Sequence, residues 1–163
     1  MEYRNDTICA VSTPPGTSGI AVIRISGADA VPTVQSIFKS KSDLSKAKSH
    51  SIHFGRIVDQ GKVIDDVLIS VFLAPNSYTG EDVIEISCHG NTFISGLIME
   101  LLLQKIRMAE PGEFTQRAFF NDKIGLTQSE AVGDLLHVQT RRSHQAAILQ
   151  LEGNLRRRIE KIL

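Results

Sequence analysis

Two charged residues interrupt stretches of the sequence that otherwise have the apolar character of β-strands. Arg24 lies within residues 20–25, and Glu85 lies within residues 83–88. Successive side chains of a strand point to opposite faces of a sheet, so each charge shares its face with apolar or small neighbours. A charge that is buried without a partner is strongly destabilising. Each of these residues therefore needs a partner, either in the protein or in a ligand.

A folate would satisfy both charges. Its pterin ring presents an N–H group and an exocyclic amine side by side, and a carboxylate such as that of Glu85 accepts from both. Its glutamate tail carries carboxylates, which arginine and lysine bind well. The spacing alone leaves open the alternative that Arg24 and Glu85 are sheet-edge residues or pair with each other.

Metal, thiol and phosphate-loop sites are not expected. His89 follows Cys88, but no C-x-x-C or H-x-x-x-H spacing occurs. A nucleophilic Cys88–His89 pair is disfavoured because adjacent strand residues point to opposite faces. The sequence contains no G-x-x-x-x-G-K-[ST], and the glycines at 16 and 19 do not open a helix. We therefore expect no GTP binding of the phosphate-loop kind and no GTPase activity, and we predict no catalytic residue and no metal ligand.

The composition is that of an ordinary globular chain. The 163 residues are 42% hydrophobic and 22% charged, and the mean hydropathy is −0.02. Eighteen Lys and Arg balance eighteen Asp and Glu, so the net charge favours neither a nucleic acid nor a membrane as partner. We expect a cytoplasmic protein because there are only two cysteines, no signal-peptide pattern and no apolar run of about 18 residues.

The pattern of apolar residues predicts a mixture of strands and helices. A hairpin is expected around the turn at residues 59–62, and Pro111–Gly112 should end the second helix. The expected strands are residues 7–12, 20–25, 52–58, 63–72 and 83–88, and the expected helices are residues 30–39 and 94–102. This order predicts an α+β domain with a mixed sheet and flanking helices.

After Phe120 the sequence becomes helical in character. Thr127 and Glu130 have the spacing of a capping box, no proline follows, and only Gly133 and Gly153 interrupt a long helical pattern that runs to Leu163. An apolar residue recurs at every fourth position, at Ala147, Leu151, Leu155, Ile159 and Leu163. We expect this stripe to belong to a helical domain that the chain contains only in part, or to a dimer interface. The arginines at 156–158 are interpreted as a solvated helix face rather than a tRNA contact.

Four motifs occur in a fixed order from Asp6 to about Leu136. They are D-T-I with T-P-P-G at residues 6–16, I-R-I-S-G at 23–27, S-Y-T-G-E-D-V-I-E with H-G at 77–90, and P-G-E-F-T-Q-R-A-F with N-D-K and Q-S-E-A-V at 111–132. Together they resemble the N-terminal part of the MnmE family, also called TrmE, of tRNA-modifying GTPases.

The resemblance implies a fold, a ligand and an assembly. The fold would be like the tetrahydrofolate-binding fold of the glycine-cleavage T protein, followed by a C-terminal helical segment. Residues 1–119 would form a folate-binding and dimerisation domain, and residues 120–163 would begin a truncated helical domain without the GTPase domain. The ligand would be 5-formyltetrahydrofolate or 5,10-methylenetetrahydrofolate.

The resemblance also assigns residues. The family's folate contacts correspond to Arg24, Glu85 and Lys123, of which the first two are the strand-embedded charges. Arg117 and His89 are expected to support the ligand site rather than contact the ligand.

The intact family protein would act with the flavin-dependent partner MnmG on the wobble uridine of tRNA. GTP, Mg²⁺ and K⁺ would bind only in the missing GTPase domain. Two alternatives remain. One is a structural dimerisation and partner-docking module with a degenerate folate site. The other is a direct tRNA-binding module that uses the arginines at 141–142 and 156–158.

Three residues depart from the family pattern. Asn91 follows the H-G motif where a second glycine is usual, and we expect it to retain a left-handed turn. Glu110 stands where arginine is common, which alters the local charge. Gly125 replaces a usual aspartate just after Lys123, which affects how that lysine is held.

Overall fold

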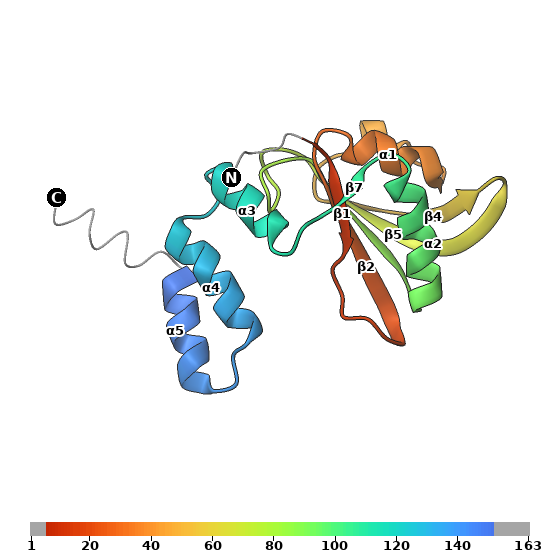
Figure 1. Ribbon diagram of the computed structural model, residues 1–163. Coiled ribbons are helices and arrows are strands. Elements are labelled where there is room, and N and C mark those ends of the chain that lie inside the picture. Colours follow the sequence, from red (N-terminus) through yellow and green to blue (C-terminus); the bar gives the residue numbers. More distant parts are fainter. Residues whose placement is uncertain (1–5, 152–163) are drawn as a thin grey trace. The chain divides into compact units, whose positions relative to one another are not determined.

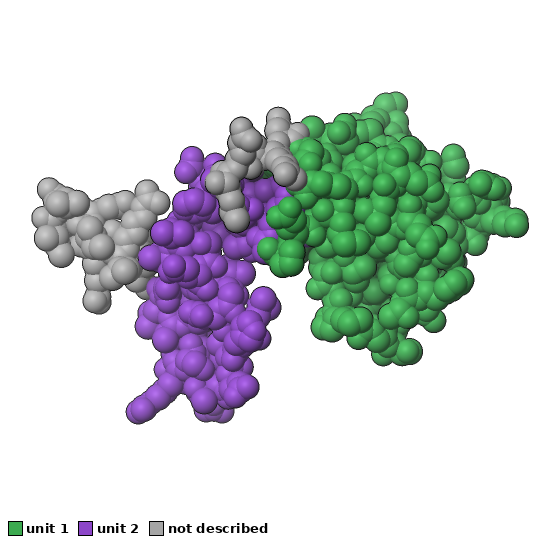
Figure 2. Space-filling view, viewed as in Figure 1, with its two compact units in different colours: residues 1–111 green, residues 112–163 purple. Residues whose placement is uncertain are grey.

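A computed structural model describes residues 6–151 of the chain. These residues belong to two compact units, residues 1–111 and residues 112–163 (Figure 2). The functional division that the sequence predicts, after residue 119, stays a prediction. No helix of the described part is long and apolar enough to cross a membrane.

The first unit is built on one seven-stranded sheet (Figure 1). Its strand order is β3-β4-β5-β6-β2-β1-β7, and every neighbouring pair is antiparallel except β1 and β7, which are parallel. The strands are β1 Ile8–Val11, β2 Ser18–Ser26, β3 Phe38–Lys39, β4 Ser51–Asp59, β5 Lys62–Phe72, β6 Val83–Gly90 and β7 Arg107–Met108. The predicted mixed sheet of an α+β fold is confirmed.

Helices α1 (Ala30–Ile37) and α2 (Thr92–Leu103) pack on the sheet and close its core. A short 3-10 helix, η1 (Leu44–Lys46), lies in the lysine-rich loop between β3 and β4. Leu44 is buried, whereas the lysines of this loop are exposed. The core side chains come from alternate strand positions, such as Ile23 and Ile25 of β2. The positions between them, including Arg24, lie on the opposite face of the sheet, which we call the outer face.

The predicted hairpin is confirmed, and its turn has the expected geometry. Gln60 and Gly61 join β4 to β5 with φ angles of 46° and 81°. Two successive positive φ angles are typical of a type I′ turn, whose twist matches that of antiparallel strands. The register that follows places Arg56 opposite Asp66, and these two side chains form an ion pair at 2.8 Å.

The described part of the second unit contains three helices, and it corrects two expectations. They are α3 (Glu113–Phe120), α4 (Leu126–Leu136) and α5 (Arg141–Leu151). The predicted capping box of Thr127 and Glu130 is wrong, because the N-cap of α4 is Gly125. The N–H of Gly125 donates to Oε1 of Gln128 at 2.8 Å.

The helical pattern also does not continue without a break, because α4 ends before residues 137–140 and α5 begins after them. Ala147 is buried in α5, and Leu151 is the last described residue of that helix. The remaining members of the predicted apolar stripe and the arginines at 156–158 lie outside the described residues.

Candidate functional site

Arg24 and Glu85 face each other across β2 and β6 on the outer face of the sheet. The Nε and Nη2 atoms of Arg24 lie 2.9 Å and 2.8 Å from the same Glu85 oxygen, Oε1. The two side chains are 28% and 25% exposed, so the pair is partly open to solvent. In the structure, Arg24 and Glu85 therefore pair with each other, which is one of the alternatives that the sequence left open.

The Arg24–Glu85 pair also contacts Tyr78, and Glu85 has an oxygen that can accept a further hydrogen bond. The guanidinium of Arg24 lies 5.3 Å from the ring centroid of Tyr78, within the range of a cation–π interaction. The second carboxylate oxygen of Glu85, Oε2, accepts no hydrogen bond from residues 6–151. A ligand N–H group can therefore bond to Oε2 while the ion pair stays in place.

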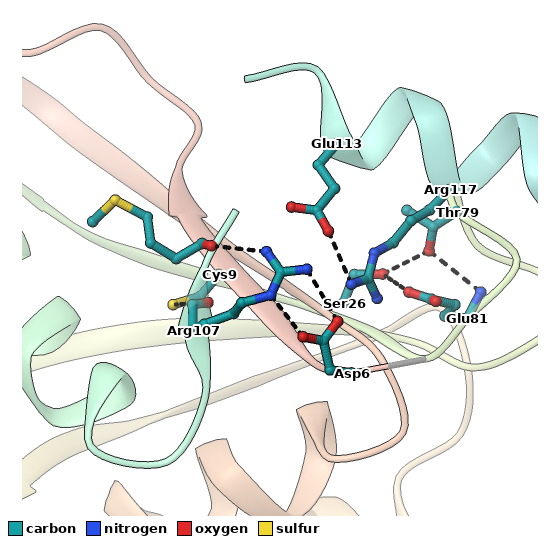
Figure 3. A network of polar contacts seen from close by, with 9 residues as sticks. Asp6, Cys9, Ser26, Thr79, Glu81, Arg107, Glu113 and Arg117 are labelled. Carbon is teal, nitrogen blue, oxygen red and sulfur yellow. Dashed lines mark hydrogen bonds and ion pairs between the residues drawn. The ribbon is translucent and has the colours of Figure 1, made fainter. Parts of the chain in front are cut away.

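The I-R-I-S-G and S-Y-T-G-E-D motifs meet at the end of β2 (Figure 3). The Ser26 hydroxyl bonds Oγ1 of Thr79 at 2.7 Å and donates to Oε2 of Glu81 at 2.6 Å. A serine hydroxyl has one hydrogen, so Thr79 must be the donor to Ser26. Ser26 and Thr79 are fully buried. This chain of hydroxyls joins the loop before β6 to β2, two residues after Arg24 in sequence.

The D-T-I motif has a structural role at the same end of the sheet (Figure 3). The carboxylate of Asp6 accepts two hydrogen bonds from Arg107 of β7, at 2.6 Å and 3.1 Å. Thr7 accepts a hydrogen bond from the N–H of Asp29 through Oγ1 at 2.9 Å. Gly27 has a φ of 130° and passes so close to Thr7 that a Cβ atom would lie 2.7 Å from its Cα atom. This close approach explains the glycine that ends the I-R-I-S-G motif.

His89 bonds to Asp65 rather than to Glu85 or Arg24. Oδ2 of Asp65 accepts from the His89 backbone N–H at 2.8 Å, and Oδ1 lies 2.6 Å from the ring Nδ1. Its neighbour Cys88 is buried, and its thiol lies 3.5 Å from the carbonyl oxygen of Ala21. Cys88 and His89 therefore belong to different environments.

Both cysteines are free and buried. Burial raises the pKa of the Cys9 thiol to about 11. Burial and then the charge of Asp65 raise the pKa of the Cys88 thiol to about 11 as well. The described residues contain no group of three or more His, Cys, Asp or Glu side chains that could hold a metal ion.

Arg117 lies in α3 of the second unit. Its side chain is 2% exposed, and its Nη2 atom donates to Oε1 of Glu113 at 3.1 Å, one helical turn earlier (Figure 3). Gly112, the N-cap of α3, has a φ of 77°, a left-handed conformation that favours glycine. The P-G-E-F motif therefore starts the helix and supplies the partner of Arg117.

Lys123 follows α3 in the second unit. Its backbone N–H donates to the carbonyl oxygen of Ala118 at 2.9 Å, and the preceding Asp122 has a φ of 55°. Its exposed side chain lines a hollow of about 440 Å³ together with residues of the α4 N-terminus, including Gly125 and Gln128. Helix N-termini favour anions, so this hollow combines two features that suit a carboxylate.

Asn91 does not form the left-handed turn expected for it. Its φ is −127°, and its side chain accepts a hydrogen bond from the N–H of Phe93 at 2.8 Å as the N-cap of α2. Asparagine is among the best N-cap residues, so Asn91 caps α2 where the family usually has a second glycine.

The sequence predicted Arg24 and Glu85 as site residues, but it did not predict the residues that contact the predicted ones. Tyr78 contacts Arg24 and Asp65 bonds His89, and neither was predicted as a site residue. Asp65 follows the apolar Val63 and Ile64 in a predicted strand. An acid in an apolar strand could have indicated a site residue here, as it did for Glu85.

Comparison with known proteins identifies the family. Residues 7–123 match the family model described as GTP-binding protein TrmE N-terminus. The tRNA modification GTPase MnmE of Flavobacterium johnsoniae is 54% identical over 160 residues, which cover 96% of this chain and 34% of that protein. The protein of the same name from Lacticaseibacillus paracasei is 52% identical over 160 residues, with the same coverage. That from Carboxydothermus hydrogenoformans is 49% identical over 162 residues, 96% of this chain and 35% of that protein.

The chain spans about a third of the length of these curated relatives. The family-model match takes in the motifs from Thr7 to Lys123, and with them the strand-embedded pair Arg24 and Glu85. By the family model and by these relatives, the chain belongs to the family of the N-terminal part of the GTP-binding protein TrmE, or MnmE.

Proposed function

We propose that the chain binds a reduced folate that carries a one-carbon group, 5-formyltetrahydrofolate or 5,10-methylenetetrahydrofolate. The observation that carries the proposal is the ion pair of Arg24 and Glu85 within strands β2 and β6, only about a quarter exposed and with one carboxylate oxygen open to a donor. A structural ion pair gains little from such a place, because desolvation offsets much of its attraction.

The chemistry of the pair fits the pterin end of the ligand. Oε2 of Glu85 would accept from the exocyclic amine or the ring N–H, and Arg24 would hold the carboxylate in position. Tyr78 offers an aromatic ring beside the guanidinium, at 5.3 Å. The residues of the pair would thus bind and orient the ligand, and the chain itself would transfer no group.

Lys123 is the third proposed folate contact, and the observations that support it come from the second unit alone. Lys123 and residues at the N-terminus of α4 line one hollow, and a lysine and a helix N-terminus both attract a carboxylate such as those of the glutamate tail. Arg117 and His89 are proposed as supporting residues, since each is held by an acid in its own unit, Glu113 and Asp65 respectively.

The wider role would be that of the family's intact proteins. The chain would form a homodimer and act with MnmG on the wobble uridine of tRNA in the cytoplasm, while GTP, Mg²⁺ and K⁺ would bind to a GTPase domain outside this sequence. The homodimer is supported by apolar side chains on the outer face of the sheet. Among them Phe54 is 65% and Leu68 is 45% exposed, and these two are direct cross-strand partners.

Calorimetric titration of the chain with 5-formyltetrahydrofolate tests the proposal. We expect saturable binding with one ligand per chain. Sedimentation of the same sample establishes whether the chain is dimeric during the titration. A dimeric chain that gives no heat at near-millimolar ligand would refute folate binding and favour the alternative of a dimerisation and partner-docking module.

The second alternative, direct tRNA binding, predicts a different experimental result. Arg141 and Arg142 are exposed at the start of α5, where the helix dipole does not favour cations. Binding of tRNA that weakens steeply with salt concentration would support this alternative, because phosphate contacts release counterions.

A further inference from the structure

The Asp65 carboxylate connects strands β5 and β6 beyond the point where their backbone pairing ends. The pairing of β5 with β6 ends at Leu68 and Ser87. Beyond this point, the two oxygens of Asp65 bond the backbone N–H and the ring Nδ1 of His89, at 2.8 Å and 2.6 Å. The Asp65 side chain is 7% exposed, whereas that of His89 is 67% exposed. A buried acid therefore holds an imidazole that faces solvent.

This arrangement determines which ring nitrogen carries the hydrogen. An ionised carboxylate only accepts hydrogen bonds, so Nδ1 of His89 must be the donor. In the neutral ring the lone pair is then at Nε2. Within residues 6–151, no group bonds this nitrogen. His89 thus presents a hydrogen-bond acceptor of defined orientation to the solvent.

The acceptor lies on the same strand as the proposed pterin contact. His89 comes four residues after Glu85 in β6, which places both on the same strand face, about 14 Å apart along the strand. Ser87 lies between them, and the cross-strand partners of Ser87 and His89 on β2 are Val22 and Ile20. One strip of the outer face therefore has an acid at one end, small or apolar side chains in the middle and an imidazole acceptor at the other end.

We propose that Asp65 is a positioning residue that holds His89 in the Nδ1–H tautomer, and that Nε2 of His89 accepts a hydrogen bond from an N–H group of the bound folate. The inference rests on the proposed function and adds a second anchor to it. Glu85 binds the pterin end, and His89 binds a donor farther along the ligand. His89 then contacts the ligand, beyond the supporting role that the sequence indicated.

Nitrogen-15 NMR of the histidine rings tests the part of the proposal that concerns Asp65. The spectrum is recorded on the whole chain, in a buffer alkaline enough to keep the rings neutral, and His89→Asn identifies the signal. We expect the Nδ1–H tautomer in the wild-type chain. In Asp65→Asn the amide would donate to Nδ1, so we expect the Nε2–H tautomer. An Nε2–H tautomer in the wild-type chain would overturn the proposal.

Titration of two variants with 5-formyltetrahydrofolate tests the ligand contact. In His89→Asn the amide N–H still reaches Asp65 but the acceptor at Nε2 is lost, so we expect affinity to fall about fivefold or more. In His89→Gln the amide oxygen takes the place of Nε2, and we expect most of the affinity to remain. Asp65→Asn should weaken binding as His89→Asn does, because it makes Nε2 a donor.

His53→Asn is the matched control, since within residues 6–151 the ring of His53 in β4 bonds only Ser51, at 2.8 Å. Thermal unfolding of each variant shows whether it is folded. Wild-type affinity in a folded His89→Asn variant would overturn the inference and leave the proposed function intact. Absence of binding to the wild-type chain would instead refute the proposed function, and the ligand contact of His89 with it.

Discussion

One oxygen of Glu85 accepts a hydrogen bond from Nε of Arg24 and forms an ion pair with Nη2 of the same side chain, across strands β2 and β6. The other oxygen of the same carboxylate remains open to a donor from outside the described residues. A partly buried ion pair with this asymmetry can bind a ligand without first being broken.

The charge of Glu85 should matter for the ligand much more than for the fold. We expect Glu85→Gln to lower the affinity for 5-formyltetrahydrofolate by more than about 1 kcal/mol, or about fivefold, because an amide has a single acceptor oxygen and cannot bond Arg24 through one oxygen and a ligand N–H through the other. Isothermal titration calorimetry measures this change.

Asp66→Asn is the matched control for that experiment. Asp66 pairs with Arg56 across β4 and β5 at 2.8 Å, and both side chains are about half exposed. An exposed pair contributes about 0–1 kcal/mol to stability, so this variant should bind the folate as the wild type does. Equal losses of affinity in the two variants, or no loss in Glu85→Gln, would contradict a pterin-binding role of Glu85.

Lys123 should recognise the carboxylates of the ligand. We expect Lys123→Gln to weaken binding of 5-formyltetrahydrofolate about tenfold, in line with a charge-assisted hydrogen bond. The same change should leave the binding of a reduced pterin without a glutamate tail unaltered. Lys46→Gln, in η1 of the first unit, serves as the control. An equal effect of Lys123→Gln on both ligands would argue against the tail as its partner.

The buried hydroxyl of Ser26 should stabilise the end of β2. We expect Ser26→Ala to lower the free energy of unfolding by about 1–3 kcal/mol, because its hydroxyl bonds both Thr79 and Glu81. Ser40→Ala removes an exposed hydroxyl that donates to Phe54, at 2.7 Å, and should cost about 1 kcal/mol or less. Urea denaturation measures both, and equal effects would mean that the buried network adds nothing.

Three glycines should respond differently to replacement by alanine. Gly27→Ala should be the most destabilising, because its φ is 130° and the new Cβ would lie 2.5 Å from Oγ1 of Thr7. Gly61→Ala meets no atom within 4 Å, so it should cost only the strain of its φ of 81°, about 1–3 kcal/mol. Gly96→Ala, in α2 with open space around it, should stabilise by about 0.5–1 kcal/mol. Any other ranking in urea denaturation would contradict these placements.

The two thiols should be unreactive in the folded chain. Burial raises the pKa of Cys9 and Cys88 to about 11, so both remain protonated near neutral pH. We expect alkylation to be slow until the chain is unfolded, as thiolate is the nucleophile. A pKa raised in the folded state favours the protonated form. The corresponding stability is therefore complete below the ordinary thiol pKa and is lost as pH rises from about 9 to about 11.

Cys9→Ser and Cys88→Ser chains provide the comparison. A serine hydroxyl does not titrate in this range, so the alkaline loss of stability should be smaller in both variants. Rapid labelling of either native thiol would contradict the burial described for it.

The apolar alternation of the sequence predicted the central strands because it is a local property. Residues 20–25 and 83–88 have one buried face each, and the structure contains β2 and β6 at these positions. Pairs that meet across long sequence distances were not predicted. Strand β7 has two residues and exists through its parallel pairing with β1, about 100 positions away. Helix α3 was also missed, since its buried residues include Glu113 and Arg117, which do not give an apolar pattern.

By itself the sequence determined that Arg24 and Glu85 stand in apolar strands and need partners, because burial of an unpaired charge is unfavourable whatever the fold. It did not determine which partners they have. The antiparallel register of β2 and β6 placed the two charges opposite each other, and the separation of β5 from β6 brought Asp65 to His89. Register and strand separation depend on the packing of the whole sheet, so only the tertiary structure decided how these four side chains are paired.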